Sequence, residues 1–94
     1  MKPRYSLGEI VISKSGRDCG NYYIIVDQED SNYVKIADGE YKKIEYPKRK
    51  NAKHIQSTGD VIEELAIWLK AKKRIRNEDL KKFLKDYQKN EEAK

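Results

Sequence analysis

The stretch GEIVISKSGRDCGNYYIIVD, residues 8–27, decides the fold. In its first part Ile10 and Ile12 share one face of an extended chain and their neighbours share the other, which is the period of two typical of a strand. In its last part, residues 22–26 are apolar or aromatic at nearly every position, which suits a strongly bent strand in a small closed sheet. A short polar segment separates the two parts. The stretch therefore predicts a β-hairpin.

The turn of this hairpin combines glycines with cations. Gly16 and Gly20 frame it, and glycine adopts a positive φ without a Cβ clash and lets backbone N–H groups approach a phosphate. Lys14 and Arg17 extend from the same turn, and the planar fork of an arginine matches a phosphate or the edge of guanine. The turn therefore predicts contact with an anionic partner. The alternative is an ordinary turn with solvated charges.

Further strands follow the hairpin. Residues 33–37 predict a third strand, and 52–57 predict a short edge strand anchored by Ile55. Residues 40–51 are expected to form a loop, because Pro47 and the lysines argue against a central strand. Strands spaced 8–12 residues apart with turns between them indicate a small barrel or sandwich.

From residue 60 the pattern becomes helical. Asp60 is expected to cap a first helix, with Glu63 completing a capping box, and Asn77 to cap a second. Apolar residues at helical spacing are Val61, Leu65, Trp68 and Leu69, then Leu80, Phe83, Leu84 and Tyr87. The predicted organisation is a mainly β barrel of about five strands over residues 1–59, followed by a C-terminal helical extension over 60–94 with a frayed end.

Three roles are open for the helices. They cover an open end of the barrel with Leu65 and Trp68 as anchors, which is the usual fate of an apolar stripe. Alternatively they dock on a partner protein, or the basic segment KAKKRIR, residues 70–76, extends a nucleic-acid surface.

Bulk composition limits the function. The chain has 94 residues, of which 37% are hydrophobic and 39% charged, so it forms a thin core and no large substrate cavity. It contains no apolar run long enough to span a membrane, and MKPRYSLGEI has no apolar signal core. One cysteine excludes an intrachain disulfide. We expect a cytoplasmic protein.

Positive charge is concentrated in YKKIEYPKRKNAKH, residues 41–54. The segment holds six lysines and arginines against one acid, so it accounts for the whole net charge of +5. Such an electrostatic footprint indicates nucleic-acid binding. Tyr41, Tyr46 and His54 are interleaved with the cations and are expected to stack on unpaired bases. The alternatives are a solvated basic loop and, for PKRK, a nuclear localisation signal.

Three blocks in order carry a family resemblance: GRDCG in the hairpin turn, then YVKIADG (33–39), then PKRKNAKH (47–54). The hairpin resembles a KOW motif. Together the blocks resemble the KOW-bearing large-subunit ribosomal proteins of archaea and eukaryotes (the fourteen-e family), and still more the short bacterial KOW-domain proteins related to them. The resemblance covers about residues 5–59. Many relatives have a basic residue after the second glycine, where this chain has Asn21.

The resemblance implies an SH3-like barrel that binds RNA, usually ribosomal RNA, with ribosomal proteins as further partners. Combined with the charge pattern, it predicts a set of RNA-binding side chains and no cofactor. The predicted residues are Lys14, Arg17, Lys42, Lys43, Lys48, Arg49, Lys50, Lys53 and His54, with Gly16 and Gly20 shaping the turn.

The residue inventory argues against an enzyme and against a metal site. Cys19 lies near Arg17, whose charge favours the thiolate form. However, nothing in the sequence pairs Cys19 with the single histidine, His54, as a nucleophile and its base. One cysteine and one histidine do not make a zinc site. We expect neither a membrane partner nor a small-molecule substrate. The competing hypothesis is an SH3-like adaptor that binds proteins of the transcription or translation machinery, since fold alone does not choose the ligand.

Overall fold

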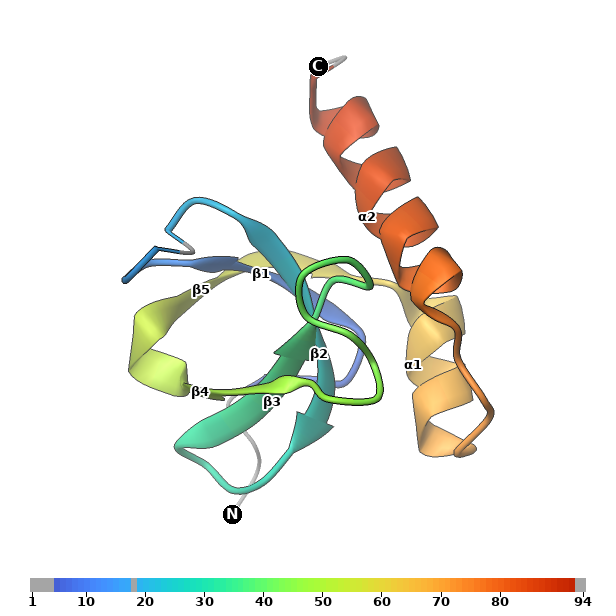
Figure 1. Cartoon of the computed structure of the whole chain (residues 1–94), viewed down its shortest axis with the longest axis horizontal. Coiled ribbons are helices and arrows are strands. Elements are labelled where there is room, and N and C mark those ends of the chain that lie inside the picture. Colours follow the sequence, from blue (N-terminus) through green and yellow to red (C-terminus); the bar gives the residue numbers. More distant parts are fainter. Residues whose placement is uncertain (1–4, 18, 93–94) are drawn as a thin grey trace.

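The computed structural model describes residues 5–17 and 19–92 and consists of one curled sheet and two helices (Figure 1). The elements in chain order are β1 Glu9–Ser13, β2 Tyr22–Gln28, β3 Tyr33–Ala37, β4 Lys48–Asn51, the 3-10 turn η1 Ala52–His54, β5 Ile55–Val61, α1 Glu63–Lys70 and α2 Asn77–Glu92. The strands lie in the order β4-β3-β2-β1-β5, and every pair is antiparallel. The two edge strands are joined through η1, so the sheet has a barrel-like shape. The predicted mainly β class with two C-terminal helices is confirmed.

Both faces of the central strands are covered. One cluster of buried side chains lies between the sheet and the helices, and a second fills the inside of the curl. The first contains Ile10, Ile24, Val26, Ala37, Leu65, Ile75, Leu80 and Leu84, and the second contains Val11, Tyr23, Ile25, Val34, Ile36 and Ile55. Consecutive residues of β2 alternate between the two clusters, which explains why residues 22–26 are apolar throughout.

The helices share the core of the sheet. Leu65 and Leu80 are completely buried, and Ile75, in the link between the helices, is buried with them. Trp68 is only half-buried; it packs edge-on against Phe83, with the ammonium of Lys73 4.7 Å from its ring centroid. The predicted role for Leu65 as a buried anchor is therefore confirmed, and α2 contributes as much to this core as α1.

The predicted loop over residues 40–51 was wrong in its last third. β4 forms there and pairs with β3 through Val34↔Lys50 and Ile36↔Lys48. Because β4 is an edge strand, Pro47 directly before it removes no hydrogen bond from the centre of the sheet.

Both predicted helix caps were also misplaced. Asp60 lies inside β5, which continues to Val61, and the position before α1 is Ile62, which makes no side-chain capping bond. At α2 the Arg76 carbonyl accepts the first helical N–H groups from Asp79 and Leu80, and the Arg76 N–H donates to the Asp79 carboxylate at 3.1 Å. The cap therefore falls one residue before Asn77, whose side chain contacts the loop before β4 instead.

Candidate nucleic-acid interface

Two other connections lie beside the hairpin 14–21, namely the loop 38–47 and η1. The register pairs Ile10 with Ile24 and Ile24 with Ala37 in antiparallel strands, so the end of β1, the start of β2 and the end of β3 lie together. Ser13 pairs with Ile55, which brings η1 beside the hairpin, while the Ala52 N–H of η1 donates to the carbonyl of Asn32 in the β2–β3 turn at 2.7 Å. The hairpin 14–21 therefore lies beside both the loop 38–47 and η1, which β4 separates from each other (Figure 1). We call this region the loop end.

The hairpin presents its cations to solvent. Gly16 and Gly20 have φ values of +75° and +90°, and a Cβ at either position would meet nothing within 4 Å. The turn is closed by hydrogen bonds from the Ser13 N–H to the Asn21 carbonyl at 3.1 Å and from the Gly20 N–H to the Ser13 carbonyl at 2.8 Å. Lys14 and Arg17 are exposed on this frame. The open space around the glycines leaves room for a bulky anion.

η1 adds two more predicted residues beside the hairpin. The Lys14 N–H donates to the His54 carbonyl at 2.8 Å, which joins the hairpin to η1. Lys53 and His54 are both exposed. Four of the nine predicted RNA-binding residues therefore lie side by side on two bonded connections.

The loop 38–47 contributes Lys42 and Lys43. Lys43 is exposed and Lys42 half-buried, and both follow the tight turn that Asp38 begins. Tyr41 and Tyr46 are 78% and 85% exposed, so neither folds back onto the barrel. Proteins that bind single-stranded RNA commonly combine exposed aromatic rings, on which bases stack, with neighbouring cations.

The cations of β4 do not form one surface, because side chains alternate along a strand. Lys48 and Lys50 lie opposite the buried Ile36 and Val34 and face the inside of the curl. Lys48 is half-buried and Lys50 is only 8% exposed. These two lysines therefore present little charge to a polyanion.

Arg49 faces the other way and is engaged within the protein. Its Nε donates to a Glu29 carboxylate oxygen at 2.6 Å, and its guanidinium carbon lies 3.7 Å from the centre of the Tyr33 ring. The hydrogen bond to Glu29 raises the pKa of Arg49 above its ordinary value. Glu29 neutralises much of this charge, so Arg49 is poorly suited to meet phosphate.

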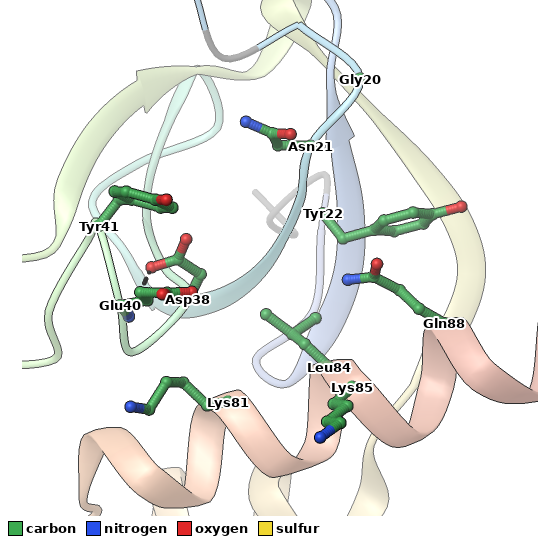
Figure 2. Close-up of a pocket in the computed structure, with 10 residues that line it drawn as sticks. All are labelled: Gly20, Asn21, Tyr22, Asp38, Glu40, Tyr41, Lys81, Leu84, Lys85 and Gln88. Carbon is green, nitrogen blue, oxygen red and sulfur yellow. Dashed lines mark hydrogen bonds between the residues drawn. The ribbon is translucent and has the colours of Figure 1, made fainter.

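Two cations on α2 were missed at the sequence level. Lys81 and Lys85 are exposed and line a pocket with the hairpin and the turn 38–41 (Figure 2). Their spacing of four residues, each directly after a leucine of the apolar stripe, places them on one flank of the helix. The sequence contains this spacing, but the prediction considered only the cations of residues 70–76 as an extension of the nucleic-acid surface. In Figure 1 the link 71–76 lies on the opposite side of the molecule from the hairpin.

Three further features bear on function, namely a disulfide, a metal site and a membrane-spanning helix. Cys19 is a free, exposed thiol. Within residues 5–17 and 19–92, no three histidine, cysteine or acidic side chains gather as metal ligands would. The helices of this part of the chain are also too short or too polar to cross a membrane.

Comparison with known proteins agrees with the KOW resemblance. No family model matches the chain. The chain is similar to the large ribosomal subunit protein eL14 of Methanococcus vannielii, with 35% identity over 57 residues, which is 61% of this chain and 68% of that protein. Its five-stranded barrel-like sheet, its glycine-framed hairpin and this similarity together place the chain in the eL14 family of KOW-type large-subunit ribosomal proteins.

Proposed function

We propose that the protein binds ribosomal RNA as a non-enzymatic component of the large ribosomal subunit, through the cations of the loop end. The observation that carries the proposal is the junction of the hairpin with η1, where the Lys14 N–H donates to the His54 carbonyl. It brings Lys14, Arg17 and Lys53 to one exposed surface of a family member whose relative is a ribosomal protein.

The contacts proposed here are mostly with the RNA backbone. Lysine and arginine side chains neutralise phosphates and release counterions, so affinity depends strongly on salt. Phosphate contacts position the protein and read shape more than sequence. Lys42 and Lys43 extend the surface along the loop 38–47, whereas Arg49 and Lys50 contribute little because of their pairing and burial. Neighbouring ribosomal proteins are further proposed partners; the similarity to eL14 does not favour the adaptor alternative.

A filter-binding titration with a structured fragment of large-subunit ribosomal RNA tests the proposal. The interface variant carries Lys14→Glu, Arg17→Glu and Lys53→Glu. The control variant carries Lys70→Glu, Lys72→Glu and Arg74→Glu, three exposed residues at the end of α1 and in the link, with the same change of net charge. We expect the interface variant to lose affinity at least about tenfold more than the control at low salt.

Two results would overturn the proposal. One is the absence of binding by the unaltered protein at low salt. The other is equal loss of affinity in the interface and control variants, since that would reflect net charge rather than a located surface. Circular dichroism of both variants shows that each remains folded.

A further inference from the structure

A pocket of about 460 Å³ opens between the hairpin, the turn 38–41 and α2. Figure 2 shows Asn21 on the hairpin side, Tyr41 and Glu40 on the turn side, and Lys81 and Lys85 on the helix side. The three walls come from segments far apart in the sequence. A cavity of this size accepts one nucleotide, and its lining mixes polar and apolar side chains, which suits a ligand with both a charged group and a flat ring.

The helix wall is cationic. Lys81 and Lys85 flank Leu84, whose side chain is buried in the core and fixes this turn of α2 against the sheet. Neither lysine forms an ion pair with a described residue, so both ammonium groups are available to a ligand. Two lysines one helical turn apart suit a phosphate group.

The turn wall presents an aromatic ring on a rigid frame. One carboxylate oxygen of Asp38 accepts the N–H groups of Glu40 at 2.9 Å and Lys42 at 2.8 Å. The N–H groups of Asp38 and Gly39 in turn donate to the Lys42 carbonyl at 2.9 and 3.0 Å. Tyr41 lies within this closed turn and is 78% exposed. Such a ring offers a face on which a base can stack.

The turn is also fixed relative to the helix. A Cβ on Gly39 would lie 2.3 Å from the Asn77 carbonyl oxygen, so the backbone of the turn is in direct contact with the start of α2. The backbone segments that carry Tyr41 and the two lysines are therefore held together before any ligand arrives. Pre-organisation of this kind lowers the entropy cost of binding.

The remaining polar groups match the edge of a base. The side-chain amides of Asn21 and Gln88 both donate and accept hydrogen bonds. The exposed carboxylate of Glu40 accepts N–H donors and repels phosphate, which places the base on the turn side and the phosphate on the helix side. Guanine has the N–H donors that such a carboxylate prefers.

We propose that this pocket binds one unpaired nucleotide, preferably guanosine, with its base stacked on Tyr41 and its phosphate held by Lys81 and Lys85. The inference rests on the proposed RNA-binding function and names a subsite of it. Unpaired nucleotides are where RNA exposes bases to protein side chains.

Fluorescence anisotropy with two RNA hairpins tests the subsite. One hairpin carries a single bulged guanosine, and the other has the same stem fully paired. We expect the unaltered protein to bind the bulged hairpin about tenfold more tightly than the paired hairpin. This difference in affinity is what stacking of one base on one aromatic ring contributes. Tyr41→Ala removes this preference, whereas Tyr46→Ala, a change at an exposed tyrosine of the same loop outside the pocket, retains it.

The lysines are tested with a matched pair of variants. Lys81→Gln with Lys85→Gln reduces the preference for the bulged hairpin, while Lys82→Gln with Lys89→Gln, exposed on the same helix away from the pocket, leaves it unchanged. Failure of the unaltered protein to bind either hairpin at low salt would overturn the proposed function and the subsite together. Equal binding of the two hairpins, or a preference that survives Tyr41→Ala, would overturn the subsite and leave the proposed function standing.

Discussion

The side-chain carbonyl of Asn77 accepts the backbone N–H of Ile44 at 2.8 Å, and its amide donates to both carboxylate oxygens of Glu45 at 2.9 and 2.8 Å. These bonds join the loop before β4 to the first turn of α2. The loop that carries Lys42 and Lys43 is therefore held by the helix, so the stability of the C-terminal segment and the geometry of the loop end are coupled.

Replacement of Asn77 by alanine should destabilise the fold. The change removes these bonds and leaves the N–H of Ile44 without its partner, at a cost of about 1–3 kcal/mol in the free energy of unfolding. Urea denaturation followed by circular dichroism measures it. Asn90→Ala, at an exposed position late in the same helix, should stay within about 0.5 kcal/mol. Equal effects of the two changes would contradict a specific role for Asn77.

Gly39→Ala should be far more damaging than Gly59→Ala. Both glycines have a positive φ, +82° and +87°, so both changes cost about 1–2 kcal/mol of backbone strain. Only at position 39 does the new Cβ also meet the Asn77 carbonyl oxygen, at 2.3 Å, whereas a Cβ at position 59 would meet nothing within 4 Å. We expect a total cost of about 3 kcal/mol or more at position 39. Thermal denaturation of the two variants gives the comparison, and similar melting temperatures would refute the close packing.

Leu80→Ala should show that α2 belongs to the core of the barrel. Leu80 is completely buried among residues of the sheet and of α1, so its truncation should cost about 2–5 kcal/mol. Ile67, at the centre of α1, is 65% exposed, and Ile67→Ala should change the free energy of unfolding by about 0.5 kcal/mol or less. Chemical denaturation tests both. A small effect at Leu80 would mean that the helix packs loosely.

Arg17 and Arg49 should differ in their effect on the salt dependence of RNA binding. Arg17→Gln removes a phosphate contact, so the slope of log Kobs against log salt concentration should fall in magnitude by about 0.7–0.9. Arg49→Gln should leave the slope unchanged, because Glu29 already neutralises that arginine at 2.6 Å. Binding isotherms at several salt concentrations measure both slopes. A change on Arg49→Gln as large as that on Arg17→Gln would show that the internal ion pair opens on binding.

The hairpin and the helices were predictable from local patterns. Alternating residues identified β1, and the spacing of Leu65, Leu80 and Leu84 identified two amphipathic helices. β4 was missed because three consecutive cations, residues 48–50, hide the alternation of buried and exposed positions. Lys50 is only 8% exposed, and its charge alone does not distinguish it from an exposed lysine. The cap at Asp60 was misplaced because pairing of Val61 with Glu9 extends β5 past the turn signal of Gly59.

The candidate site was predictable in composition but not in arrangement. The hairpin glycines and the exposed Lys14 and Arg17 follow from local sequence. The pairing of Arg49 with Glu29 depends on contact between segments twenty residues apart. The convergence of Lys81 and Lys85 with the hairpin depends on where α2 packs, which a sequence alone does not state.

The contact between Gly39 and Asn77 also bears on how the protein can vary over evolution. Extra residues inserted after Gly39 would push the backbone into the start of α2, whereas insertions around Gly16 or Gly20 would enter open space. Homologous chains should therefore differ in the number of residues in the hairpin and keep a constant spacing from Asp38 to Ile44. One connection is free to adapt to different RNA partners, while the other is constrained by the architecture.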